Sequence, residues 1–229
     1  ADISARLAQL GISFTRVPGV DLAAEGGLQR ARRSGAVPEG YDLAHAQRVA
    51  RTTFQNAGGI LGAAGCAAGH LGAMREASGP ASARGPLALV LEDDVMLVDD
   101  FAPKLRRLLD EEAPCDWSAI SLRSKCPYGA CVSPHLTRVF PDGNEPYERC
   151  RHGVNYGFFA MLYRISDLHD LRSRLAKAVW DADRPHCLDV DVALASISDE
   201  VAYYAVPNVQ VPGFLSEGAH GSSRVDINA

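Results

Sequence analysis

The stretch Pro86–Leu97, PLALVLEDDVML, places three consecutive acidic residues directly after an unbroken apolar run. Leu87–Leu91 is apolar at every position rather than at alternate ones, which is typical of a strand buried on both faces of a covered sheet. Glu92, Asp93 and Asp94 follow it, and no basic residue adjoins them. Crowded carboxylates at a strand end repel one another and lose hydration, so they need a partner that the local sequence does not supply.

A divalent cation would remove this conflict. Mg²⁺ and Mn²⁺ prefer carboxylate oxygens, and both also bind the oxygens of a diphosphate. We therefore expect a metal site at Glu92, Asp93 and Asp94. The alternative interpretation is a solvated turn in which Asp94 caps a helix.

The rest of the chain alternates strand-like and helix-like patterns, and its 229 residues suit a single domain, 1–229. Such alternation predicts an α/β fold: a Rossmann-type sandwich with a mostly parallel central sheet flanked by helices. In these sheets ligands bind at the carboxyl ends of strands, where the acidic triplet lies. The expected strands are 12–20, 87–91, 117–122, 154–165 and 201–209; the expected helices are 2–10, 43–54, 59–78, 99–113 and 166–180, and 188–199 is a helix or a strand–helix junction.

The composition of the chain indicates which classes of binding partner are not favoured. Hydrophobic residues make up 47% and charged residues 22% of the chain, and the formal net charge is -5. With no block of basic residues, binding to nucleic acid or to a membrane surface is not favoured. No apolar run approaches the roughly 18 residues of a membrane span. The absence of a visible signal peptide and of an N-x-S/T sequon favours a cytoplasmic location, whereas six cysteines leave a secretory-pathway lumen open.

The cysteines give no metal motif of their own. None forms a CxxC pair, so a structural zinc site is not expected. Cys126 and Cys131 in CPYGAC are spaced for a small disulfide loop, with Cys150 as a competing partner; the alternative is unpaired thiols. Cys66 lies one helical turn before His70, and we expect it to pack in the core, because no basic neighbour is evident that would activate its thiol.

Seven blocks of sequence follow one another in an order and spacing that resemble glycosyltransferase family 25, the group of lipopolysaccharide and procollagen galactosyltransferases. Together they span most of residues 5–215. The blocks are LAQLGISFTRVPGVD (7–21), GAAGCAAGHLGAM (62–74), ALVLEDDV (88–95), DWSAISL (116–122), GVNYGFFAMLYRIS (153–166), LDVDVAL (188–194) and VAYYAVPNV (201–209).

The resemblance implies a GT-A-like fold that transfers a hexose, galactose or glucose, from a UDP-sugar with inversion. The acceptor would be a hydroxyl of a glycan or protein, and the cofactor Mn²⁺ or Mg²⁺. By the same resemblance Asp94 coordinates the metal, Asp93 contacts the ribose or a metal-bound water, and Glu92 supports the pair. His220, in the Gly/Ser-flanked segment SEGAHGSS, is a second candidate metal ligand, with a solvated polar tail as the alternative.

Inverting transfer also needs a base for the acceptor hydroxyl. Asp189 and Asp191 are the candidates, and their i, i+2 spacing lets only one of them face a site, whether the segment is a strand or a helix. Asp191 is favoured because Asp191-x-x-Leu194 is closest to the family pattern, and Asp189 is the better helix cap.

Other residues are expected to bind the donor or the sugars. His70 is placed near the donor or at the wall of the metal site, the alternative being a buried structural histidine. Asn155, Tyr156 and Gly157 lie in the Gly-rich block where a sugar would bind, although Asn155 and Tyr156 are equally compatible with edge packing.

Two other functions remain open. The family begins with a strand that holds the nucleotide base, and this chain has no match to it, which leaves a catalytically degenerate glycan- or protein-binding domain as the alternative. A Mg²⁺-dependent phosphohydrolase is the third possibility, but no second acid cluster or lysine of the usual spacing accompanies the triplet.

Overall fold

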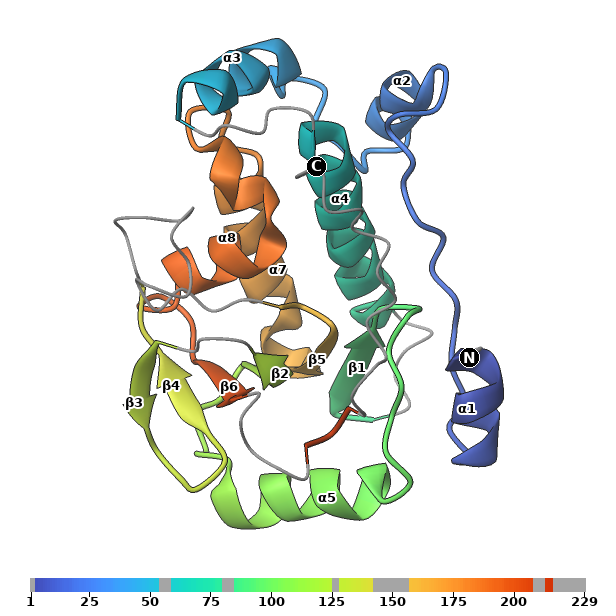
Figure 1. Cartoon of the computed structure of the whole chain (residues 1–229), viewed down its shortest axis with the longest axis vertical. Coiled ribbons are helices and arrows are strands. Elements are labelled where there is room, and N and C mark those ends of the chain that lie inside the picture. Colours follow the sequence, from blue (N-terminus) through green and yellow to red (C-terminus); the bar gives the residue numbers. More distant parts are fainter. Residues whose placement is uncertain are drawn as a thin grey trace, which may run out of the picture.

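A computed structural model describes residues 3–53, 59–79, 85–124, 128–141, 157–207 and 213–215. It confirms the α/β class: a six-stranded sheet has helices packed on both sides, with α4, α7 and α8 above the sheet and α5 below it in Figure 1. The strands are β1 (Leu87–Leu91), β2 (Ala119–Ser124), β3 (Gly129–Cys131), β4 (Thr137–Val139), β5 (Ala160–Arg164) and β6 (Tyr203–Pro207).

The helices largely follow the predicted segments. The long helix predicted over 59–78 is α4, and the one predicted over 166–180 is α7, which begins one residue earlier. The helices are α1 (Ile3–Gln9), α2 (Gly27–Arg33), α3 (Leu43–Thr53), α4 (Ile60–Ala77), α5 (Phe101–Arg107) with its π-helical continuation η3 (Leu108–Glu112), α7 (Ile165–Val179), the 3₁₀ turn η5 (Pro185–Leu188) and α8 (Val190–Ser196).

The prediction of a mostly parallel sheet is wrong for the described strands. The strand order is β1-β5-β2-β6-β4-β3, and only β2 and β6 pair in parallel. Parallel neighbours need a crossover connection, usually a helix. Between β2 and β5 the described chain contains only the short strands β3 and β4, so β5 returns antiparallel and lies between β1 and β2. Because β5 opposes both neighbours, β1, β2 and β6 still run in the same direction.

Two hydrophobic clusters cover the two faces of the sheet. Alternate residues of β5 enter different clusters: Met161 and Tyr163 pack with α4, α7 and α8, whereas Ala160 and Leu162 pack with α1 and α5. This period of two is the normal consequence of strand geometry. The first cluster therefore places α4 against the same face of the sheet as α8.

The segment 12–20 is not a strand, contrary to prediction; it has no regular secondary structure. It runs beside α4, where the carbonyl of Val20 lies so close to Gly65 that a Cβ at this glycine would overlap it. A backbone that packs against a helix in this way has no neighbouring strand to supply ladder hydrogen bonds, so its apolar residues were misleading as a strand signal.

No helix in the described ranges is long and apolar enough to cross a membrane. Within these ranges Cys66, Cys115, Cys131 and Cys187 carry free thiols. Cys126 and Cys150, the other members of the proposed disulfide alternatives, lie outside the described residues.

Candidate functional site

The site forms where the end of β1 meets the middle of α4. Glu92 is the first residue after β1, and its Oε1 lies 3.1 Å from Nε2 of His70 on α4. The His70 side chain is 7% exposed and that of Glu92 is 27% exposed. The strand therefore ends at the level of His70, and the acidic triplet begins where the helix offers a buried imidazole.

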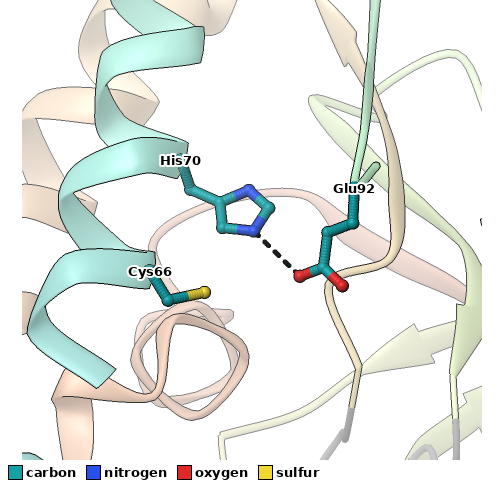
Figure 2. A group of neighbouring side chains, drawn as sticks. All are labelled: Cys66, His70 and Glu92. Carbon is teal, nitrogen blue, oxygen red and sulfur yellow. Dashed lines mark hydrogen bonds and ion pairs between the residues drawn. The ribbon is translucent and has the colours of Figure 1, made fainter. Parts of the chain in front are cut away.

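Cys66 belongs to the same group. It lies one turn before His70 on α4, and Figure 2 shows both side chains directed toward Glu92. The donor atoms of Cys66, His70 and Glu92 all lie within 4.8 Å of one another. The prediction that Cys66 packs in the core is wrong, because Cys66 is exposed.

The electrostatics of His70 reflect these neighbours. Burial, the largest single influence, opposes protonation of the imidazole, but the hydrogen bonds and charges of Cys66 and Glu92 together outweigh it and raise the pKa of His70 to about 9. The ring packs edge-on against Phe158, with ring centroids 4.9 Å apart. His70 is thus buried, as the alternative of a buried structural histidine expected, and it also contacts Glu92 of the acidic triplet.

The short segment Gly157–Phe159, just before β5, connects the predicted site residues. The Gly157 N–H donates to Oδ2 of Asp191 at 2.8 Å, the Phe158 ring contacts His70, and the Phe159 carbonyl accepts the N–H of Glu92 at 2.9 Å. Residues that are far apart in the sequence therefore converge on three consecutive positions of one segment.

Gly157 is required at its position for a steric reason. Its φ is +115°, a conformation that residues with a side chain rarely adopt, and a Cβ there would overlap the ring of Phe159. The glycine allows the chain to turn its N–H toward Asp191 before it enters β5. Asn155 and Tyr156, predicted with Gly157 as sugar-binding residues, lie outside the described residues.

Asp191 is buried in the first turn of α8 and is 7% exposed. Its Oδ1 accepts the N–H of Val192 at 2.8 Å, and its Oδ2 accepts that of Gly157. Its charge, after burial itself, raises the pKa of Tyr203 on β6. Asp189 occupies the N-cap position of α8, although its side chain makes no capping hydrogen bond. The structure therefore separates the two aspartates: Asp191 is joined to the segment Gly157–Phe159, and Asp189 begins the helix.

Asp93 and Asp94 form an exposed turn after Glu92. Two carboxylates in solvent beside a third that is bonded to His70 leave oxygen donors accessible to a hard cation. The chain returns to this region near its end: Leu215 forms a β-bridge with Leu97, and the Phe214 carbonyl accepts the N–H of Val98. His220, the second predicted metal ligand, lies outside the described residues.

Sequence reasoning missed the joint position of Cys66, His70 and Glu92. The i, i+4 spacing of Cys66 and His70 was a usable signal, because two donors at this spacing lie on one helix face. The third donor follows a strand that is distant in the sequence, so its approach depends on how α4 packs against β1.

Comparison with known proteins gives no family assignment. No family model matches the chain, and no curated protein matches it significantly.

Proposed function

We propose that the protein is a metal-dependent glycosyltransferase that moves a hexose from a UDP-sugar to a hydroxyl of a glycan or protein acceptor, with inversion. The observation that carries the proposal is the convergence of Glu92, His70 and Asp191 on the segment Gly157–Phe159, beside the exposed pair Asp93 and Asp94. The GT-A-like fold, the family membership and the donor are part of the same proposal, and they draw on the sequence blocks described above.

The donor set at the end of β1 fits a hard divalent cation. Asp93 and Asp94 offer exposed carboxylates, while Glu92 is held by His70 and by its backbone bond to Phe159. Asp94 would hold Mn²⁺ or Mg²⁺, Asp93 would contact the ribose or a metal-bound water, and Glu92 would fix the turn. Such a cation neutralises the charge that develops on a departing nucleoside diphosphate.

Asp191 is the proposed base for the acceptor hydroxyl. It is the aspartate that Gly157 links to the rest of the group, whereas Asp189 lies at the helix N-cap. Both carboxylate oxygens of Asp191 accept a backbone N–H, from Gly157 and from Val192. The backbone bonds would hold the carboxylate in one orientation for proton transfer.

His220 remains a proposed second ligand of the hard cation. Support comes from the bridge between Leu215 and Leu97, since Leu97 follows Asp94 by three residues and His220 follows Leu215 by five. The described chain thus passes close to the acidic turn shortly before the histidine.

The proposal is tested by measuring release of UDP from UDP-galactose and from UDP-glucose, with and without Mn²⁺. We expect Mn²⁺-dependent turnover of at least one donor by the wild type and a loss of about 100-fold or more in Asp94→Asn, the scale seen when a charge-stabilising group is removed. Asp110→Asn is the matched control, because Asp110 is an exposed aspartate on η3, away from the site. Equal turnover by Asp94→Asn and wild type, or no Mn²⁺-dependent binding of UDP, would refute the assignment.

A further inference from the structure

We propose that Cys66, His70 and Glu92 form a binding site for a thiophilic divalent cation, specifically Zn²⁺, distinct from the hard-cation site proposed at Asp93 and Asp94. The three donor atoms come from two successive turns of α4 and from the first residue after β1, and they converge on one point (Figure 2). This inference does not depend on the proposed transferase activity.

The distances suit a tetrahedral ion. Zinc–ligand bonds of about 2.0–2.3 Å place the donor atoms of a tetrahedral site roughly 3.3–3.8 Å apart. Here Nε2 of His70 and Oε1 of Glu92 are 3.1 Å apart, and no pair in the group exceeds 4.8 Å. Side-chain adjustments of up to about 1 Å would therefore turn the hydrogen-bonded pair and the neighbouring thiol into three ligands.

The frame around the donors is already ordered. Phe158 packs edge-on against the imidazole, and the Glu92 backbone is fixed by its bond to Phe159. Nδ1 of His70 is buried and has no hydrogen-bond partner in the described part of the chain, so Nε2 is the nitrogen that the group presents. Binding a cation at Nε2 displaces the proton that Nε2 holds toward Glu92 and leaves the imidazole proton on Nδ1.

The donor types select the metal. A thiolate and an imidazole favour Zn²⁺ over Mg²⁺ and Mn²⁺, which prefer oxygen alone. Because Cys66 is exposed, an ion can enter from solvent, and a fourth position remains for water. Three protein ligands with one open position is the arrangement of reactive rather than purely structural zinc sites.

Glu92 connects this site with the acidic turn. A cation bound at Cys66 and His70 takes up the charge of Glu92, which relieves the repulsion among three adjacent carboxylates. Asp93 and Asp94 then remain as the oxygen donors for a hard ion. The chain thereby presents two neighbouring sites of different chemical preference.

The test is a titration of the metal-free protein with Co²⁺, a spectroscopic substitute for Zn²⁺. Wild type is expected to develop a thiolate-to-cobalt charge-transfer band in the near ultraviolet that saturates at one equivalent and disappears when Zn²⁺ is added. Cys66→Ser is expected to lose the band. His70→Gln and Glu92→Gln are expected to weaken Co²⁺ binding by at least ~10-fold, as loss of a ligand or of its support does.

Cys115→Ser is the matched control, because Cys115 is also an exposed free thiol but lies outside the group; it keeps the band. Zn²⁺ should also raise the melting temperature of wild type and of Cys115→Ser but not of Cys66→Ser. Circular dichroism checks that each variant is folded, and Glu92→Gln, altered at a partly exposed position, provides the test if a helix variant does not fold.

The proposal is overturned if wild type shows no thiolate band, if Cys66→Ser retains it, or if Cys115→Ser and Cys66→Ser lose it equally. Asp94→Asn separates the two proposals: it keeps the cobalt band if the zinc site is real, whether or not the wild type turns over a UDP-sugar. Cobalt binding without any UDP-sugar turnover would leave this inference standing and remove the proposed function.

Discussion

The backbone N–H of Gly157 donates a 2.8 Å hydrogen bond to Oδ2 of Asp191, and this bond joins the entry to β5 with the first turn of α8. The next residue, Phe158, contacts His70, and Phe159 accepts a bond from Glu92. A substitution at Gly157 or Asp191 should therefore also alter the positions of His70 and Glu92.

Gly157→Ala should destabilise the protein by about 1–3 kcal/mol, because it combines an unfavourable φ with a steric overlap at Phe159. Urea unfolding measures the change. Gly35→Ala isolates the backbone contribution, since Gly35 also has positive φ but its Cβ would meet nothing within 4 Å. A cost for Gly157→Ala no larger than that for Gly35→Ala would show that the overlap is relieved without consequence.

Asp191→Asn should cost about 1–3 kcal/mol, because one carboxylate oxygen becomes an amide group that cannot accept a backbone N–H. Asp189→Asn is the control: Asp189 stands at the N-cap position without a side-chain capping hydrogen bond, and asparagine is equally favoured there, so the stability should change by less than about 0.5 kcal/mol. If the proposed function holds, Asp191→Asn also loses hexose transfer while it still binds UDP. Unchanged transfer by Asp191→Asn would refute its proposed role as the base and leave it a structural role alone.

Two glycines of α4 should respond oppositely to the same substitution. Gly65→Ala brings a methyl group onto the carbonyl of Val20 and should destabilise by about 1–3 kcal/mol. Gly69→Ala meets nothing within 4 Å and should stabilise by about 0.5–1 kcal/mol, because alanine is the better helix former. Thermal unfolding of the pair checks the packing of Val20 against α4, and similar effects at both positions would argue against that packing.

Tyr41 should make stability pH-dependent in the alkaline range. Burial, with help from the charges of Asp181 and Asp42, raises the pKa of Tyr41 to about 12. The unfolded chain has the ordinary value of about 10, so this contribution is fully present below about pH 10 and is lost as the pH rises toward 12.

Tyr41→Phe should therefore lose stability more slowly than wild type over that range. At neutral pH the two should differ by no more than about 1 kcal/mol, since the hydroxyl is buried with no hydrogen-bond partner among the described residues. Urea unfolding as a function of pH measures the difference, with the exposed Tyr128→Phe as control. Parallel curves for wild type and Tyr41→Phe would contradict the assignment.

Local patterns predicted the elements of the fold better than their arrangement. The unbroken apolar run Leu87–Leu91 identified β1, and helical periodicity identified α4 and α7 within about a residue. These features depend on neighbouring residues, which the sequence displays directly. The expectation that the run Leu87–Leu91 is buried on both faces is wrong: β1 is an edge strand of the described sheet, Leu87 is exposed, and the other residues of β1 are half-buried. The antiparallel insertion of β5 between β1 and β2 depends instead on a long connection between β2 and β5, and no local pattern encodes its direction.

The site shows the same division. Glu92, His70, Gly157 and Asp191 were identified from their motifs, and the structure brings them together. The exposure of Cys66 was missed because helical spacing places it on the same face as buried His70 and Met74. The spacing does not show that this face is covered at His70 and open one turn earlier, at Cys66.

The ladder between β1 and β5 ends with Leu91 opposite Ala160. Glu92 directly follows Leu91, and Phe159 directly precedes Ala160. We therefore expect neither junction to accept an inserted or deleted residue. A single deletion or insertion there would shift the alternation by one position and turn Glu92 away from α4. In natural variants of this protein, insertions and deletions should therefore fall in the connecting segments. None should fall at the junctions Leu91–Glu92 and Phe159–Ala160.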